Sequence, residues 1–288
     1  MRAGTDWRKA TIEERQAYEH KVWGPWAAKF SDDSKLRVVD DLATYFGEGR
    51  HAEGEAILRA LGDLRGKNVL ECGCGPGGQL PLFARAGARV WGFDLVPEVV
   101  AVARRSCRVN GVEDRVELGV SSMEDLSYPD GTFDRVVGFG VLHHVNVALA
   151  SRQVHRVLKP GGVAVFSEPL GMNPILEWAR SHVPYPGKEE HGTDVPLSEE
   201  DVATFAAPFR SHEVQPFYFL SMIQQVLGWK VPRPVLREND PAFLRRHPAV
   251  ACGYRRAMLS LRSADEALLR RFPGLGRYHR LAVMTFVK

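Results

Sequence analysis

The sequence predicts a doubly wound α/β fold, in which helices cover both faces of a mostly parallel sheet of seven strands. Three features predict it. Short apolar segments alternate with helical segments from Asn68 to about Lys159, a glycine-rich turn follows the first apolar segment, and two further strand-like segments come later. A helix between two strands returns the chain to the same end of the sheet, so the alternation favours parallel pairing.

The elements of this block follow one another closely. The strand NVLEC begins at Asn68, and the helical segment QLPLFARAG after it is closed by Gly87. Pro97 lies near the start of the next helix, and Asn110-Gly111 lies at its end, where these residue types are common. Five strands are expected, NVLEC, ARVWGFDL, RVELGV, FDRVVGF and VAVFSEP. The helix before the fifth lies in VALASRQVHRVLKPGG and is stopped by Pro160 and two glycines.

The chain is less regular after Pro169. Ser198, followed by acids, is a good helix start. SHEVQPFYFLS and LAVMTFVK are the expected sixth and seventh strands, and the residues between them read as helices broken by prolines. We therefore expect four regions: an N-terminal helical cover at 1–66, a cofactor-binding core at 67–221, a helical insertion that acts as a substrate lid at 222–280, and the last strand of the core at 281–288.

The composition is that of an ordinary globular protein and argues against some classes of partner. Of the 288 residues, 44% are hydrophobic and 25% are charged, and a formal net charge of +3 gives no reason to expect nucleic acid. The polar N-terminus lacks the apolar core of a secretion signal, and no apolar run is long enough to span a bilayer. The four cysteines show neither disulfide nor zinc spacing. We expect a cytoplasmic protein with reduced thiols, of unspecified oligomeric state.

The segment VLECGCGPGG is the most informative motif. Without its acid, Gly73, Gly75 and Gly78 spell the dinucleotide fingerprint, whereas with Glu71 the same letters spell E-x-G-x-G-x-G. Glycines let the backbone turn sharply and approach a ligand, and the free N–H groups of the following helix point at that ligand. Asp94, at the end of the second strand, is placed to accept hydrogen bonds from two ribose hydroxyls. The motif therefore predicts a ribose-containing cofactor and leaves open which one.

Four segments occur in the same order as in one known family. They are VLECGCGPGG, WGFDL, MEDLSYPDGTFDRVVGFGVLHHV and VLKPGGVAVFSEP, and they cover residues 67 to about 170. In this order they resemble the class I S-adenosylmethionine (SAM)-dependent methyltransferases, above all the small-molecule branch with its quinone-biosynthetic and natural-product enzymes. The resemblance implies a Rossmann-like core, SAM as cofactor, S-adenosylhomocysteine as product, and transfer of a methyl group to an O, N or C atom of a small organic molecule.

Two other functions stay open on the sequence. A SAM-binding protein without transferase activity would carry the same loop, since a fold does not dictate a function. A nicotinamide (NAD)-dependent oxidoreductase would share the glycines, although it has no need of DLSYPDGTFD or VLKPGG.

The resemblance also assigns roles around the cofactor. In chain order they are Glu71 at its amino-acid end, Gly73, Gly75 and Gly77 where the loop backbone approaches, Asp94 at the ribose, Leu95, Ser122, Met123 and Glu124 around the adenine, and Phe139 and Gly140 on the methionine side. Many members have an aspartate where this chain has Ser122, whose hydroxyl can also accept a hydrogen bond from the adenine amino group.

Three residues are candidates for the chemistry. His143 and His144 follow the fourth strand, where a neutral imidazole suits general-base work near pH 7; the alternative is a histidine that caps or packs on the turn. Glu168, at the tip of the fifth strand, is placed either to orient a substrate hydroxyl or amine or to pair with an arginine.

The same turn argues against other substrate classes. GFGVLHH has none of the carboxylates of metal-dependent O-methyltransferases, no polar-Pro-Pro-aromatic tetrad of nucleic-acid amine methyltransferases, and no cysteine nucleophile. We therefore expect no metal and no nucleic-acid substrate.

Two regions are candidate covers. The N-terminal region supplies Tyr18, Trp23 and Trp26, which either pack on the sheet edge or cover the site and touch substrate or cofactor. The insertion carries three arginine pairs, which form a solvated helix face, recognise an anionic substrate or touch a membrane surface.

Overall fold

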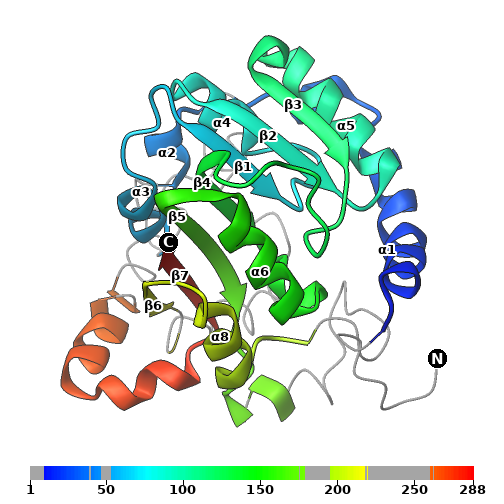
Figure 1. Ribbon diagram of the computed structural model, residues 1–288. Helices are drawn as coiled ribbons and strands as arrows, with labels where there is room; N and C mark the ends of the chain where they lie inside the picture. Colours follow the sequence, from blue (N-terminus) through cyan, green and yellow to red (C-terminus); the bar gives the residue numbers. More distant parts are fainter. Residues whose placement is uncertain are drawn as a thin grey trace, which may run out of the picture.

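The computed structural model describes residues 10–38, 40–46, 53–174, 176–178, 195–217, 219, 260–261 and 263–288. They form a seven-stranded sheet in the order β3-β2-β1-β4-β5-β7-β6 (Figure 1). The strands are β1 (Asn68–Cys72), β2 (Arg89–Asp94), β3 (Val116–Val120), β4 (Phe133–Phe139), β5 (Leu158–Pro169), β6 (Ser211–Phe217) and β7 (Leu281–Val287). Strands β1 to β5 pair in parallel, and β7 pairs antiparallel to β5 and β6. The predicted mostly parallel sheet of seven strands is confirmed.

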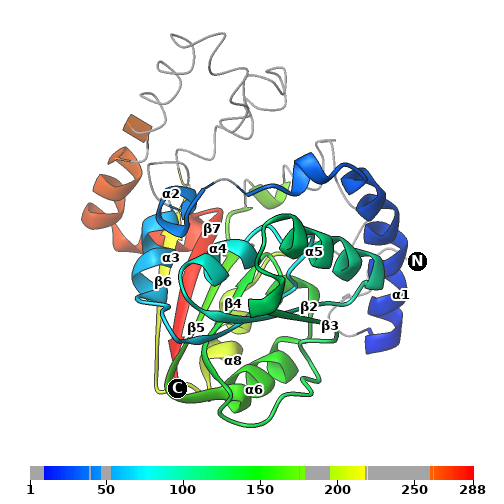
Figure 2. The same ribbon diagram turned by 90° about the horizontal axis from the view of Figure 1, so that it is seen from above.

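Helices cover both faces of the sheet (Figure 2). They are α3 (Gly54–Leu61), α4 (Leu80–Arg85) and α5 (Pro97–Val109) on one face, and α6 (Val147–Val157) and α8 (Glu199–Ala206) on the other. Val69 and Leu70, which are neighbours in β1, enter different cores: Val69 packs with residues of α3, α4 and α5, and Leu70 with residues of α6 and α8. This follows because successive side chains point to opposite faces of a strand.

The first helix, α1 (Ile12–Ala27), starts at a capping box. Thr11 Oγ1 accepts a hydrogen bond from Glu14 N (3.2 Å), and the Glu14 carboxylate accepts one from Thr11 N (2.9 Å). The helix packs against α5, and its Trp23 lies in an apolar cluster with Leu95 and Val96 at the start of α5. The N-terminal segment therefore reaches the carboxyl end of β2, where Asp94 lies.

The junction between α6 and β5 differs from the expectation. The sequence LKPGG predicts a turn before the fifth strand, but β5 begins at Leu158 and includes that segment. Long-range pairing is the cause. Leu158 pairs with Phe133 of β4, Gly161 N donates to Lys288 O (3.1 Å), and Lys288 N donates to Gly162 O (3.1 Å). Two long-range backbone hydrogen bonds thus extend the strand through a sequence whose local preference is a turn.

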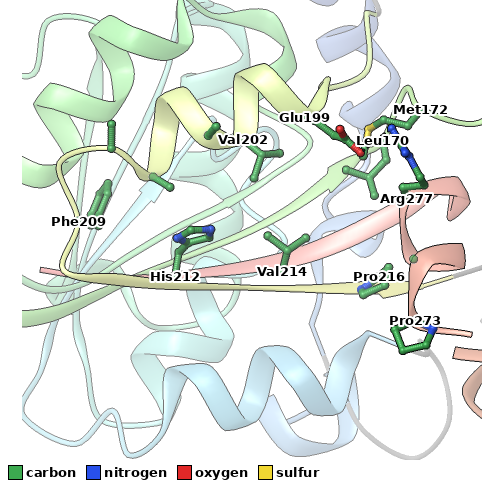
Figure 3. Close-up of a pocket in the computed structure, with 14 residues that line it drawn as sticks. Leu170, Met172, Glu199, Val202, Phe209, His212, Val214, Pro216, Pro273 and Arg277 are labelled. Carbon is green, nitrogen blue, oxygen red and sulfur yellow. Dashed lines mark ion pairs between the residues drawn. The ribbon is translucent and has the colours of Figure 1, made fainter. Parts of the chain in front are cut away.

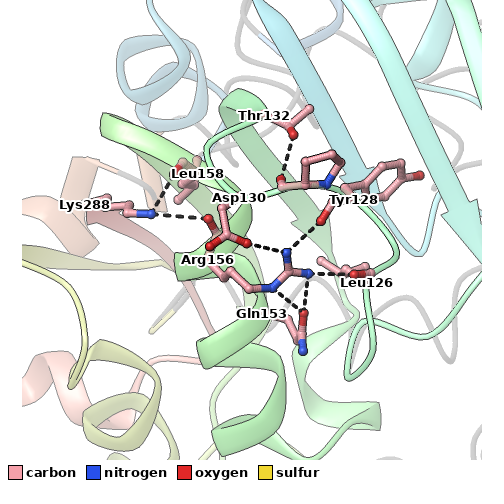
Figure 4. Close-up of polar contacts among 9 residues, drawn as sticks. Leu126, Tyr128, Asp130, Thr132, Gln153, Arg156, Leu158 and Lys288 are labelled. Carbon is pink, nitrogen blue, oxygen red and sulfur yellow. Dashed lines mark hydrogen bonds and ion pairs between the residues drawn. The ribbon is translucent and has the colours of Figure 1, made fainter.

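Arg156, near the end of α6, secures the loop that leads into β4 (Figure 4). Its guanidinium donates to the carbonyl oxygens of Leu126 (2.6 Å) and Tyr128 (2.7 Å) and to the carboxylate of Asp130 (2.8 Å). The ammonium of Lys288 donates to the carbonyl of Arg156 itself (3.3 Å). The segment between β3 and β4, where the resemblance places the adenine, is therefore fixed to α6.

The expected insertion at 222–280 lies mostly outside the described residues, as do its arginine pairs at 245–246 and 255–256. Of this region, residues 263–271 are helical, and the 3-10 turn Pro273–Tyr278 leads into β7. Among the helices that the structure describes, none combines the length and apolar character that crossing a membrane requires.

Candidate active site

The glycine loop between β1 and α4 contains three residues in the left-handed region, Gly73, Gly75 and Gly77, with φ of +61°, +52° and +77°. Their surroundings differ. A Cβ on Gly73 would lie 2.8 Å from Val141 Cγ2, and one on Gly77 would lie 3.0 Å from Ala103 Cα, whereas one on Gly75 would meet no described atom within 4 Å. Gly73 and Gly77 therefore permit close packing of the loop, and Gly75 faces open space.

This difference predicts different effects of two matched substitutions on stability and on ligand binding. Gly77→Ala adds a steric conflict with α5 to the left-handed strain, so we expect it to lower the free energy of unfolding by about 2–4 kcal/mol. Gly75→Ala adds the left-handed strain alone, so we expect it to lower the free energy of unfolding by about 1–2 kcal/mol. Its methyl group lies in the open space beside the loop, so it should weaken S-adenosylhomocysteine binding. Urea unfolding and calorimetric titration of both variants test this; equal losses of stability would contradict it.

Asp94 ends β2 and holds the loop beside it. Its Oδ2 accepts a hydrogen bond from Gly75 N (3.1 Å), and its Oδ1 accepts one from Val96 N (3.1 Å). Burial raises the pKa of Asp94 above its ordinary value, while these N–H groups act in the opposite direction. Each oxygen keeps a further lone pair, so the carboxylate can still accept hydrogen bonds from two ribose hydroxyls.

Glu71, in β1, is buried, with 1% of its surface exposed. Its Oε2 is enclosed and accepts no hydrogen bond from any residue that the structure describes, and burial raises the pKa of this carboxyl well above its ordinary value. A buried carboxyl with an unsatisfied oxygen is costly, and a cationic ligand group nearby would lower that cost. With the open space at Gly75 and the acceptors of Asp94, this oxygen fits the binding of SAM, whose amino-acid end carries an ammonium group.

The raised pKa of Glu71 predicts a stability that depends on pH. The folded state holds the Glu71 proton more tightly than the unfolded state does, so the apo protein should lose stability as pH rises from the ordinary glutamate pKa towards the raised one. Glu71→Gln removes this penalty and should leave the apo protein as stable as the wild type or more stable at pH 7. It should also reduce the increase in melting temperature that S-adenosylhomocysteine causes. Thermal unfolding with and without ligand measures both effects, and an unchanged ligand-induced increase would contradict the assignment.

The segment after β3 is built around Glu124. Glu124 N donates to Ser122 Oγ (3.1 Å), and its Oε1 accepts a hydrogen bond from Asn146 N (2.7 Å) at the start of α6. Its Oε2 forms a buried ion pair with Arg15 of α1. The side chain of Glu124 is thus engaged by protein groups, and that of Met123 is buried. What this segment can offer an adenine is therefore mainly its backbone and the Ser122 hydroxyl.

The turn after β4 is organised by Glu168. The fully buried Glu168 accepts hydrogen bonds at Oε1 from Val141 N (2.8 Å) and Leu142 N (2.9 Å), and its Oε2 lies 2.8 Å from His143 Nδ1. Of the two roles expected for Glu168, the structure provides neither an arginine partner nor an open oxygen among the described residues. It instead joins the strand tip to the buried imidazole of His143.

The two residues assigned to the methionine side lie at this turn. Phe139 stacks on Phe46 of α2 (Leu42–Phe46), with ring centroids 5.6 Å apart. Gly140 has a φ of +67° and donates its N–H to Ser167 O (2.9 Å). Gly140 is thus bonded to the residue before Glu168, and Phe139 precedes it at the end of β4.

The helix α1 completes the site from outside the sheet. Its Arg15, Tyr18 and Glu19 are buried and lie on one helix face. Glu19 Oε1 lies 3.4 Å from Nδ1 of His144, whose ring centroid is 4.0 Å from that of His143. The prediction of an N-terminal cover named aromatic residues, whereas the buried polar residues Arg15 and Glu19 were missed. No local signal marks them, because their partners are far away in the sequence.

A separate hollow of about 650 Å³ lies between α8 and β6 (Figure 3). Its lining is mainly apolar, with Val202 and Val214 facing each other across it, and Glu199 and Arg277 form an ion pair (3.0 Å) at one end. In the strand order, β4, β5 and β7 separate β6 from β1. This hollow therefore does not contain the glycine loop.

Comparison with known proteins gives the family. Residues 70–166 match the family described as a methyltransferase domain. Over 193 residues the chain is 33% identical to the ubiquinone biosynthesis O-methyltransferase of Sodalis glossinidius (strain morsitans), which covers 67% of this chain and 69% of that relative. The chain belongs to the class I SAM-dependent methyltransferases.

Other relatives of this methyltransferase share less of its length. The ubiquinone biosynthesis O-methyltransferase of Xanthomonas oryzae pv. oryzae (strain PXO99A) is 43% identical over 104 residues, which is 35% of this chain and 42% of the relative. The fold extends further: the crystal structure of geranyl diphosphate C-methyltransferase from Streptomyces coelicolor A3(2) matches with a TM-score of 0.54 and 16% identity, over 96% of this chain and 98% of that one. This methyltransferase is an enzyme that uses SAM to methylate a small molecule.

Proposed function

We propose that this methyltransferase transfers the methyl group to the hydroxyl oxygen of a small phenol or enol, with His144 as general base. The observation that carries the proposal is the pair of adjacent imidazoles after β4, each of which faces a carboxylate: His143 faces Glu168 at 2.8 Å, and His144 faces Glu19 at 3.4 Å. A base is needed only where the acceptor must lose a proton as it is methylated.

The acidity of the acceptor supports a phenol or enol. Phenols ionise near pH 10 and imidazole near 6.5, so an imidazole can remove a phenolic proton as the new bond forms, whereas an alkanol is much less acidic. The name of the Sodalis relative, an O-methyltransferase, supports the same acceptor atom. The formal net charge of only +3 favours a small molecule over a nucleic acid.

The proposed roles divide the site between binding and chemistry. SAM, when bound, supplies an electrophilic methyl group. Glu71, Gly75 and Asp94 hold the cofactor, and the backbone around Ser122 receives its adenine. His143 and Glu168 fix the turn that carries His144, and α1 excludes water above it. We expect the reaction to need no divalent cation, because the oxygens of Glu168, the carboxylate at this turn, are engaged by protein groups.

A substrate panel tests the proposal. Catechols, simple phenols, anilines and a stabilised carbon acid are incubated with SAM, with and without EDTA, and S-adenosylhomocysteine is measured by mass spectrometry. We expect turnover of a phenol that EDTA does not inhibit. His144→Asn should lower kcat about 10²–10⁴-fold and leave S-adenosylhomocysteine affinity unchanged.

The control is His20→Asn. His20 lies on the exposed side of α1, where it pairs with Glu98 (3.2 Å), and its replacement should change nothing. Turnover of anilines alone, or phenol methylation that survives His144→Asn, would contradict the proposed function.

A further inference from the structure

The first helix carries a buried carboxylate to which the proposed function gives no part in holding the cofactor. The Glu19 side chain is 9% exposed, and its Oε1 accepts no hydrogen bond within the described part of the chain. The nearest partner is the imidazole of His144, whose Nδ1 lies 3.4 Å away. Carboxylates are rarely buried without a partner, because losing hydration is costly.

We propose that Glu19 is a positioning residue for methyl transfer: when α1 is docked, its carboxylate holds Nδ1–H of His144, so that Nε2 is the basic nitrogen of that ring. The inference rests on the proposed function, in which His144 removes the proton of the acceptor hydroxyl. A neutral imidazole carries one proton on its two nitrogens, so an acceptor facing Nδ1 keeps the proton there and leaves the lone pair on Nε2.

The place of Glu19 is fixed by its neighbour on the same helix face. Arg15 lies one helical turn earlier, and residues four apart on a helix lie one above the other. Its guanidinium forms a buried ion pair with Glu124, whose other oxygen accepts a hydrogen bond from Asn146 N (2.7 Å). This anchor holds α1 over the strand ends, and Glu19 thereby reaches the turn that carries His144.

The distance suits a contact that tightens when substrate binds. At 3.4 Å, the Glu19 and His144 atoms are farther apart than in an ordinary hydrogen bond. Hydrogen bonds of catalytic groups are often long in ligand-free proteins and shorten in the substrate complex. His143 shows the closed form of the same pairing, with its Nδ1 at 2.8 Å from Glu168.

Glu19 also makes the ligand-free site less favourable. Burial raises the pKa of Asp94, and the negative charge of Glu19 raises it further. Cofactor binding requires Asp94 to be ionised, so that it accepts hydrogen bonds from the ribose hydroxyls. A second negative charge near Asp94 opposes this ionisation. A role of Glu19 in the reaction accounts for a charge at this unfavourable place.

The test compares two glutamates, each of which pairs with a histidine at a contact that α1 makes with another part of the chain. Glu19→Gln removes the buried charge at nearly constant volume, and Glu19→Asp keeps the charge on a shorter side chain. The control is Glu98→Gln, because Glu98 faces His20 of α1 at 3.2 Å with about half of its side chain exposed. Each variant is assayed for kcat and KM with the phenol that the wild type methylates, and for S-adenosylhomocysteine affinity by calorimetry.

We expect Glu19→Gln to lower kcat about 10–100-fold, the effect typical of groups that orient a reacting side chain. KM and S-adenosylhomocysteine affinity should change little, and Glu19→Asp should recover part of the rate. A spectroscopic readout needs no substrate: long-range ¹H–¹⁵N correlation should find the His144 proton on Nδ1 in the wild type and shifted towards Nε2 in Glu19→Gln. The His144 signals are assigned by their loss in His144→Asn.

The outcomes separate the two proposals. If His144→Asn lowers kcat but Glu19→Gln behaves like Glu98→Gln in rate and in tautomer, the role of Glu19 is overturned and the proposed function stands. If His144→Asn leaves phenol methylation unchanged, the proposed function fails. Equal loss of cofactor affinity and rate in Glu19→Gln would make Glu19 a structural residue of the helix and overturn the inference.

Discussion

Replacing Asp94 with alanine is expected to weaken the binding of SAM and S-adenosylhomocysteine by about 100-fold or more. The variant loses a charged acceptor for two hydroxyls, and each charge-assisted hydrogen bond contributes about 1.5–3 kcal/mol. It also releases Gly75 N and Val96 N, which Asp94 holds at 3.1 Å each, so the loop becomes less ordered. Calorimetric titration with both ligands, and with NAD for comparison, measures the loss.

The matched control for this variant is Asp63→Ala. Asp63 also accepts a hydrogen bond from the N–H group two residues later, Arg65 N at 3.1 Å, but its side chain is exposed. Its replacement should leave both affinities unchanged. Tight binding that is indifferent to Asp94 would mean that the cofactor lies elsewhere, and the assignment of the loop would be wrong.

Glu168→Ala is expected to have the largest effect on stability, a loss of about 3–5 kcal/mol. It leaves the N–H groups of Val141 and Leu142 and the ring of His143 without their buried partner, and breaking such a buried group is strongly destabilising. Chemical denaturation measures the loss. An unfolding midpoint equal to that of the wild type would contradict the role of Glu168 in organising the turn.

Glu168→Gln separates this structural role from the chemistry. Its carbonyl oxygen can still accept from the two N–H groups, so the fold should survive with a loss of about 1 kcal/mol. Its amide, however, donates to Nδ1 of His143 and reverses the tautomer of that ring. An equivalent change in a serine-protease triad lowers kcat about 10⁴-fold. Here we expect a loss of 10-fold or more, because in the function proposed above His143 supports the base and is not the base itself.

Much of the fold follows from local sequence. The segments NVLEC and FDRVVGF predict β1 and β4 at their observed bounds, because each is a short apolar run enclosed by turn residues. The start of β5 does not follow, since Leu158 is brought into the strand by pairing with Phe133 of β4, and the glycines after it by pairing with Lys288, rather than by their neighbours in sequence.

The same distinction holds for the site. Glu71, Asp94, His143 and Glu168 lie at strand ends within recognisable motifs, and parallel pairing brings such ends together. That Glu168 would engage His143 depends on the register of β4 and β5, which places Phe139 opposite Ser167. A helical N-terminal cover was predicted, but the parts that Arg15 and Glu19 play in it were not, because their partners Glu124 and His144 are distant in sequence.

The ion pair between Arg15 and Glu124 joins residues 109 positions apart, and this separation has a consequence during synthesis on the ribosome. Chain elongation at about 5–20 residues per second places about 5–20 s between the appearance of the two residues. Late in that interval α1 can pack on α5, which is complete at Val109, but Arg15 still lacks its carboxylate partner. The ion pair that anchors α1 over the strand ends therefore forms late, and a nascent chain that stalls before residue 124 lacks this anchor.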